Sequence, residues 1–237
     1  MTTLAPTPDD PPNLVPIERA RGRISDLVTE ALTEAIRDLR LPPGSVLSET
    51  DLAARLAVSR TPLLEAISRL MDHGLLTVVP QVGTRVALID LADVEQAVFI
   101  RAALETAAFR DASQQDQRDG GELRRLLEVQ RYAVGADDMD AFFEADEALH
   151  QEIFRLGGHP TVWSVLVRAK VQLDRLRRLS LPEAVDTQSL VDEHARIVDL
   201  LEAGETEVGS QVVNRHAHRA IDLIPVLRER HPAYFRH

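Results

Sequence analysis

Asp146, His150, His194 and His216 are ionisable residues that interrupt the apolar faces of three segments expected to form helices. Asp146 and His150 are one helical turn apart, so their side chains point in the same direction. A buried charge without a partner is costly, and a bound cation would satisfy all four side chains at once. Three imidazoles and one carboxylate suit zinc, nickel, manganese or iron. We therefore predict a divalent metal site, with zinc as the first choice.

The same four residues admit two other interpretations. A buried histidine is commonly held by a hydrogen bond, and Asp146 with His150 could form a structural ion pair. Three histidines and a carboxylate can also activate water for catalysis. The chain has no HExxH motif, and only Glu147 and Glu193 are candidates for a nearby general base. A metal-dependent, hydrolase-like enzyme is therefore kept as the alternative function.

The segments that carry these residues belong to a C-terminal part, residues 89–237, whose pattern is almost wholly helical. Apolar residues recur at helical spacing, and glycine or proline separates the segments. Six helices are expected, at residues 91–115, 119–134, 138–156, 160–182, 187–203 and 205–230. We predict an antiparallel all-helical bundle.

Residues 14–88 show a different pattern, in which two short helices precede a hairpin. Ser48 begins an N-terminal capping pattern, Ala57-Val58 forms the turn between the helices, and the Ser59 hydroxyl is expected to cap the second helix. Two β-prone stretches follow, at residues 75–79 and 84–88. This order predicts a winged helix-turn-helix, which places its second helix in the major groove of DNA. The predicted fold is therefore mainly α.

The run LPPGSVLSETDLAARLAVSRTPLLEAISRL…GLL…GTRV, over residues 41–86, closely resembles the N-terminal domain of the GntR family of bacterial transcription regulators. The resemblance implies that the recognition helix presents Ser59, Arg60 and Thr61 to double-stranded DNA. An arginine at that place can pair with guanine or with a phosphate, and the hydroxyls can bind phosphate oxygens.

The resemblance also implies a DNA-contacting wing, where Gly83 would allow close approach and Arg85 would lie nearby. Three residues depart from the family pattern. Thr50 and Leu64 stand where many members have a basic residue, and Ala57 stands where glycine is common. The two missing charges predict a weaker or altered half-site. A left-handed backbone at residue 57 would cost alanine about 1 kcal/mol.

The stretches ADEALHQEIFRLGGHP, DEHARIVDLLEAGE and VVNRHAHRA are similar to the FCD effector domain of the FadR-like branch of this family. The resemblance implies that Asp146, His150, His194 and His216 are the metal ligands, and that a small organic acid binds beside the metal. Arg101, in FIRAALE, matches an often basic position and is expected to clamp the effector's carboxylate. An interhelical salt bridge is the alternative role for Arg101.

The net charge of −11 argues at first against DNA binding, but it is unevenly distributed. Residues 14–88 contain nine arginines and nine acidic residues, whereas residues 89–237 contain 18 basic and 27 acidic residues. DNA binding would therefore rest on a few placed arginines and on the avidity of a dimer. The chain has no cysteine, which excludes disulfides and thiolate metal sites.

Three parts are expected along the chain. They are a disordered tail (residues 1–13), a winged helix-turn-helix domain (14–88) and a helical effector-binding and dimerisation domain (89–237). No signal peptide and no apolar run of about 18 residues is present, which predicts a cytoplasmic protein without a membrane partner.

The leading functional prediction is a ligand-responsive transcriptional regulator. We expect a repressor that binds a near-palindromic operator as a homodimer, with DNA affinity controlled by the small organic acid near the metal. A helical interaction module with an inactive DNA-binding segment is a further alternative to the enzyme.

Overall fold

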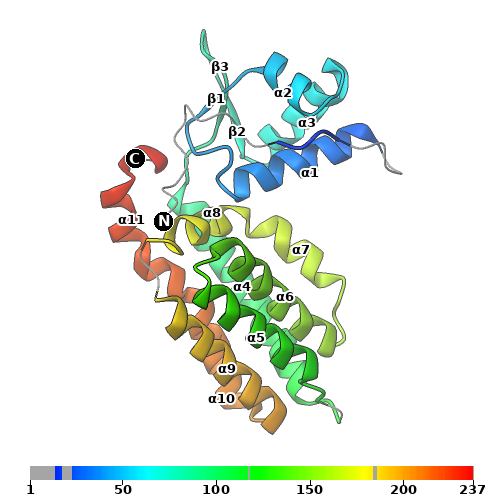
Figure 1. Ribbon diagram of the computed structural model, residues 1–237, viewed down its shortest axis with the longest axis vertical. Coiled ribbons are helices and arrows are strands. Elements are labelled where there is room, and N and C mark those ends of the chain that lie inside the picture. Colours follow the sequence, from blue (N-terminus) through cyan, green and yellow to red (C-terminus); the bar gives the residue numbers. More distant parts are fainter. Residues whose placement is uncertain (1–13, 18–22, 117, 184–185, 237) are drawn as a thin grey trace. The chain divides into compact units, whose positions relative to one another are not determined.

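A computed structural model describes residues 14–17, 23–116, 118–183 and 186–236 (Figure 1). The tail predicted at residues 1–13 lies outside the described residues. The chain divides into two compact units. The first comprises the residues up to Leu91 together with those from Arg228 onward, and the second is Ala92–Leu227. Of the described helices, none is both long enough and apolar enough to cross a membrane.

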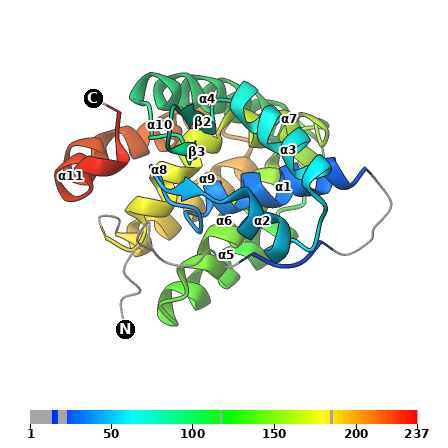
Figure 2. The same cartoon turned by 90° about the horizontal axis from the view of Figure 1, so that it is seen from above.

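The first unit has the element order of a winged helix-turn-helix. Its elements are α1 (Ile24–Arg37), β1 (Val46–Leu47), α2 (Glu49–Arg55), α3 (Arg60–Asp72), β2 (Leu76–Val79) and β3 (Gly83–Val86). Helices α1 and α3 pack side by side (Figure 2). Apolar residues spaced three or four apart, such as Leu32, Ile36, Leu63 and Leu70, are buried in this unit.

Local signals explain two helix ends of this unit, and at a third the structure differs from the prediction. The Ser48 hydroxyl accepts a hydrogen bond from the backbone N–H of Asp51 at 3.2 Å, as expected for an N-cap. Gly74 follows α3 with φ +69°, a conformation that glycine adopts at little cost. Ser59 occupies the N-cap position of α3, but its side chain makes no capping hydrogen bond. The expectation that its hydroxyl caps the helix was therefore wrong.

The sheet has three antiparallel strands in the order β1-β3-β2. The hairpin of β2 and β3 was expected, within a residue or two of its observed bounds. Strand β1, which pairs Val46 with Arg85 and Leu47 with Thr84, was not expected. Two residues carry no alternating pattern, so β1 depends on its neighbour rather than on its own sequence.

The second unit is built mainly from helices. They are α4 (Leu91–Ser113), α5 (Gly121–Gly135), α6 (Met139–Leu156), α7 (Val162–Ala169), α8 (Val171–Ser180), α9 (Thr187–Ala203), α10 (Thr206–His218) and α11 (Ile224–Arg230), whose residues from Arg228 onward are assigned to the first unit. The axes of the long helices are roughly aligned with one another (Figure 1); these helices are α4, α5, α6, α9 and α10. Contacts of α5 with α6 and α9, and of α9 with α10, enclose a core that includes Phe109, Phe154 and Leu201. The predicted fold class, a mainly α chain with a helical C-terminal domain, is confirmed.

Two of the six expected helices are interrupted. The helix expected at residues 160–182 is broken at Lys170 into α7 and α8. Lys170 is buried and its ammonium reaches the carboxylates of Glu147 and Asp174. The helix expected at residues 205–230 is interrupted by a 3-10 turn at Arg219–Leu223. Apolar periodicity did not reveal either break.

Candidate metal centre and DNA-reading helix

Three buried histidines converge inside the bundle, one from each of three helices. His150 lies on α6, His194 on α9 and His216 on α10. One nitrogen of each ring lies within 4.8 Å of the corresponding nitrogens of the other two. The Nε2 atoms of His194 and His216 are 3.3 Å apart. The structure therefore brings together three of the four predicted ligands at the spacing that one cation can bridge.

The outward nitrogen of each histidine faces an oxygen acceptor. The Nδ1 of His194 lies 2.8 Å from Oε1 of Gln130, and the Nδ1 of His216 lies 3.1 Å from Oε2 of Glu193. The Nδ1 of His150 lies 3.4 Å from Oε2 of Glu105. Hydrogen bonds from Nδ1 of His194 and of His216 leave their Nε2 lone pairs free for the centre, which is how proteins orient metal-binding histidines. Oε2 of Glu105 has no hydrogen-bond partner among the described residues, so it lies near His150 without orienting it in this way.

Asp146, the fourth predicted ligand, is fully buried beside the histidines on α6. Its Oδ2 accepts a hydrogen bond from Arg177. Its Oδ1 lies 3.4 Å from Nε2 of His194 and has no hydrogen-bond partner among the described residues. An unsatisfied buried carboxylate oxygen that faces imidazole nitrogens suits a divalent cation, so the residues present fit a metal.

The protonation states also suit a metal. Burial lowers the pKa of His194 to about 3 and that of His216 to about 4, and it lowers the pKa of His150 well below its usual value. Burial alone would raise the pKa of Asp146, but the charge of the Arg177 guanidinium beside it holds that pKa well below its usual value. At neutral pH the four groups are therefore three neutral imidazoles and one carboxylate, the forms that bind metals.

Arg101 points into this cluster from α4. Its Nε donates to Oε1 of Glu105, one turn later on the same helix, at 2.8 Å. Its Nη2 lies 3.1 Å from Nε2 of His150 and 3.4 Å from Nε2 of His216. The ion pair that was the alternative role for Arg101 thus exists within one helix and not between two helices.

A small cavity of about 40 Å³ adjoins the cluster. Three guanidinium groups line it, from Arg101, Arg177 and Arg219, next to His216. Arg177 also pairs with Glu147 and Asp174, and Arg219 pairs with Glu193. The other lining residues are mainly apolar: Ser180, Leu181, Leu190, Ala220 and Leu223. Positive charge beside an apolar wall is the lining expected for a small carboxylic acid.

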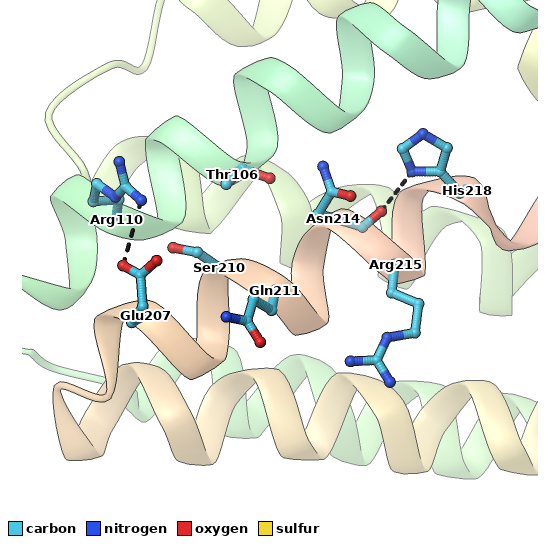
Figure 3. Close-up of a pocket in the computed structure, with 8 residues that line it drawn as sticks. All are labelled: Thr106, Arg110, Glu207, Ser210, Gln211, Asn214, Arg215 and His218. Carbon is cyan, nitrogen blue, oxygen red and sulfur yellow. Dashed lines mark hydrogen bonds and ion pairs between the residues drawn. The ribbon is translucent and has the colours of Figure 1, made fainter.

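A wider groove of about 600 Å³ lies between α4 and α10 (Figure 3). Its side chains are polar, and Arg110 faces Glu207 across it at 3.6 Å. The buried hydroxyls of Thr106 and Ser210 have no hydrogen-bond partner among the described residues. None of the four predicted metal ligands lines this groove.

The residues predicted to read DNA lie at two places in the first unit. Ser59, Arg60 and Thr61 are exposed at the start of α3, where backbone N–H groups lack partners within the helix. The Nη2 of Arg60 pairs with Oε2 of Glu49, at the start of α2, at 3.2 Å. Ala57, in the turn between the two helices, has φ +54°.

The wing carries the other two predicted DNA contacts. Gly83 is exposed with φ +112°, and no atom lies within 4 Å of a Cβ built there. Arg85, two residues later on β3, is half-buried, and its Nε has no hydrogen-bond partner among the described residues. A bare backbone and an arginine are thus presented on one strand of the wing.

Several residues of the metal centre were missed by the sequence analysis. Gln130 orients His194 from α5, Glu105 on α4 anchors Arg101 beside His150, and Arg177 on α8 holds Asp146. Glu193, considered only as a general base, orients His216. Arg177 is 31 residues from Asp146 and Gln130 is 64 residues from His194, so local spacing gives no signal for them.

Comparisons with known proteins agree with this geometry. Residues 24–86 match the model of the bacterial regulatory proteins of the gntR family, and residues 96–219 match the FCD domain. A Streptomyces ambofaciens protein, described as an uncharacterised HTH-type transcriptional regulator in an unstable DNA locus, is 38% identical over 208 residues, 86% of each chain. The HTH-type transcriptional repressor RspR of Escherichia coli K12 is 29% identical over 196 residues, 82% of this chain and 86% of RspR.

Solved structures show the same fold. E. coli McbR/YncC has a TM-score of 0.72 at 22% identity, over 88% of this chain and 99% of that chain. A GntR transcriptional regulator from Rhodococcus sp. RHA1 has a TM-score of 0.69 at 23% identity, over 85% and 97% of the two chains. The predicted resemblance is confirmed, and the enzyme alternative finds no support in these relatives. The chain belongs to the GntR family of bacterial regulatory proteins and carries an FCD domain, and it is a transcriptional regulator rather than an enzyme.

Proposed function

We propose that the protein is a repressor whose affinity for its operator is controlled by a small organic acid bound beside a metal. The observation that carries this proposal is the convergence of three neutral imidazoles and an unsatisfied carboxylate oxygen next to an arginine-lined cavity. The names of two relatives support repression rather than activation. RspR is named a repressor, and a Paenarthrobacter nicotinovorans protein with 29% identity is named a probable D-xylose utilization operon repressor.

DNA would be bound through two elements of the first unit. The exposed start of α3 would present Ser59, Arg60 and Thr61 to base edges and phosphates in the major groove. The wing would approach the DNA backbone at Gly83, with Arg85 beside it. A homodimer would place two such units on the half-sites of a near-palindromic operator. Because its ligand is the bacterial chromosome, we propose that the protein works in the cytoplasm.

The metal would be held by Asp146, His150, His194 and His216. Zinc suits this donor set first, and nickel, manganese or iron are the alternatives. The bound metal would supply a fixed positive charge to which a carboxylate can bind. The chain would supply Arg101 to clamp the carboxylate at the neighbouring cavity, as well as apolar contacts for the rest of the acid. The acid changes DNA affinity only if it binds one arrangement of the dimer better than the other.

Metal analysis of the purified protein tests the centre. We expect His150→Ala and His194→Ala each to lower the metal content per chain, measured by elemental analysis. His218→Ala is the control, because His218 is exposed on α10 and bonds only the carbonyl oxygen of Asn214 among the described residues. Full metal stoichiometry in both His150→Ala and His194→Ala would contradict the proposed centre.

Two further measurements test the other parts of the proposal. Operator selection from random DNA should yield inverted repeats, and sedimentation should show a dimer of the full chain in solution. Selected sites without two-fold symmetry would contradict the homodimer on a palindrome. Addition of the cognate acid should weaken operator binding, whereas tighter binding would show that the acid acts as a corepressor.

A further inference from the structure

Arg101 places a positive charge where a metal-binding centre is expected to be free of one. The side chain is 3% exposed, and it is anchored on α4 by the hydrogen bond from its Nε to Glu105. Its Nη2 faces both the Nε2 of His150, at 3.1 Å, and the Nε2 of His216, at 3.4 Å. A guanidinium has donors and no acceptor, so Arg101 must donate to both nitrogens.

Both histidines are prepared to accept these hydrogen bonds. The Nδ1 of His216 faces Oε2 of Glu193 at 3.1 Å. The Nδ1 of His150 makes no hydrogen bond to Oε2 of Glu105, 3.4 Å away, but its Nε2 must accept from Arg101, which places the proton of the neutral ring on Nδ1. A proton held on each Nδ1 leaves a lone pair on each Nε2. Arg101 therefore uses two of the three imidazole lone pairs that a metal would need.

A metal and the Arg101 guanidinium cannot use these lone pairs together. A zinc ion would lie about 2.0–2.1 Å from each Nε2 and would consume its lone pair. An Nη2 that stayed near the same nitrogens would also lie close to the metal and would be repelled by it. We propose that Arg101 is a resident cation of the three-histidine centre, which occupies His150 and His216 until a divalent metal displaces it. This inference rests on the proposed metal centre and adds the competitor that the metal must replace.

The displaced guanidinium has a place to go. Arg101 already lines the cavity that adjoins His216, together with Arg177 and Arg219. Rotation of the terminal guanidinium would move Nη2 away from the histidines, while the rest of the Arg101 side chain keeps its place. The donors of Arg177 and Arg219 are already engaged with carboxylates, so Arg101 would bring newly free donors to the cavity. Metal binding would thus prepare the cavity for an anion, and by linkage an anion there would favour metal binding.

Zinc affinity tests the displacement. Full-length protein is stripped of metal and titrated with zinc alone against a chromophoric chelator. We expect Arg101→Met to bind zinc about tenfold more tightly than the wild type, because no charge-assisted hydrogen bonds must be broken first. The matched control is Arg219→Met/Glu193→Gln compared with Glu193→Gln, because it removes a positive charge from the same cavity without touching any histidine Nε2 and without leaving Glu193, the partner of His216, unpaired. Equal tightening in both variants would overturn the inference, since lost charge alone would explain it.

A second pair of variants removes the effect of an unpaired carboxylate. Arg101→Met leaves Glu105 buried without its partner, and that carboxylate would itself attract zinc. We therefore compare Arg101→Met/Glu105→Gln with Glu105→Gln. A gain of about tenfold that persists in the Glu105→Gln background supports displacement. A gain that disappears in that background overturns it.

The wild type provides a test that does not depend on the folding of any variant. In a crystal structure of the zinc-loaded protein, we expect Nη2 of Arg101 to lie beyond hydrogen-bonding distance of both Nε2 atoms. A hydrogen bond retained with either histidine while zinc binds them overturns the inference and leaves the metal centre intact. Wild-type protein that binds no zinc in this titration, and no nickel, manganese or iron in parallel titrations, rejects the metal centre and the inference with it.

Discussion

Each unit has an arginine–carboxylate pair at its candidate site, and these two pairs lie in opposite surroundings. In the DNA-binding unit, the side chains of Arg60 and Glu49 are 77% and 35% exposed. In the bundle, the side chains of Arg177 and Asp146 are 11% and 0% exposed. A solvent-exposed ion pair contributes little to the free energy of unfolding, and either partner can readily pair with another group. Removing one partner of a buried pair leaves an unpaired buried charge, which is strongly destabilising. The same chemistry therefore makes one arginine available for DNA and fixes the other in place.

Further arginines of the DNA-binding unit also form exposed pairs. Arg23 pairs with Glu65, Arg55 with Asp51 and Arg69 with Asp26, and these side chains are all at least one-third exposed. DNA phosphates would compete with these carboxylates for the arginines. In the bundle, by contrast, Arg177 contacts three buried or nearly buried carboxylates, from Asp146, Glu147 and Asp174.

The largest expected effect is on the stability of the bundle. Arg177→Met would leave the buried Asp146 without its arginine and would leave Lys170 as the cation paired with Glu147 and Asp174. We expect a loss of about 3–5 kcal/mol in the free energy of unfolding. Urea denaturation followed by circular dichroism measures it. Arg125→Met is the control, because Arg125 and its partner Glu122 are both exposed. If the two variants lost similar amounts of unfolding free energy, burial would not be what makes the Arg177 pairs stabilising.

This comparison also shows which parts of the centre the sequence could predict. Asp146 and His150 share a helix face, so their common direction follows from a spacing of four residues. His194 and His216 were found because each interrupts an apolar face. Arg177 comes from α8, a helix whose residues are nearly all buried, and no apolar face was there for it to interrupt. Its contact with Asp146 depends on how α6 and α8 pack, which local patterns do not encode.

The fold divides in the same way. The helices and the wing hairpin follow from apolar periodicity, caps and turn residues, and they were predicted. Strand β1 and the break at Lys170 depend on distant partners, strand β3 in one case and Glu147 in the other. Residues whose structure is decided by tertiary contacts were the ones that the sequence analysis missed.

Operator binding should show the next largest effect. Arg60→Ala is expected to weaken binding to the cognate operator by about 1–3 kcal/mol, because an exposed arginine at the start of α3 can reach a guanine or a phosphate. Fluorescence anisotropy with a labelled operator duplex at fixed salt measures it. Arg131→Ala is the matched control, an exposed arginine paired with Glu128 in the bundle. Unchanged affinity in Arg60→Ala would remove this residue from the DNA interface.

The turn before α3 allows a smaller test that is confined to the DNA-binding unit. Ala57 has φ +54°, a conformation that disfavours a residue with a Cβ. We expect Ala57→Gly to stabilise this unit by about 0.5–1 kcal/mol. Ala54→Gly, inside α2, should instead destabilise it by about 1 kcal/mol. Thermal unfolding measures both changes in stability. A loss of stability in Ala57→Gly would contradict the inference that the backbone is strained at Ala57.

The smallest expected effect on stability comes from breaking the exposed pair itself. Glu49→Gln should change the free energy of unfolding by about 0–1 kcal/mol, because water solvates the exposed Arg60 nearly as well as the Glu49 carboxylate does. Its effect on DNA should be clearer and opposite in sign to that of Arg60→Ala, because a neutral amide in place of the carboxylate neither repels phosphates nor holds the guanidinium. We expect tighter binding to random DNA at low salt, measured by anisotropy, and therefore poorer discrimination of the operator.

In the Arg60→Ala background the part of this gain that comes from releasing Arg60 should be lost, so the two changes should not be additive. Full additivity would mean that Glu49 acts on DNA only through its own charge, and that the exposed pair does not control how Arg60 binds.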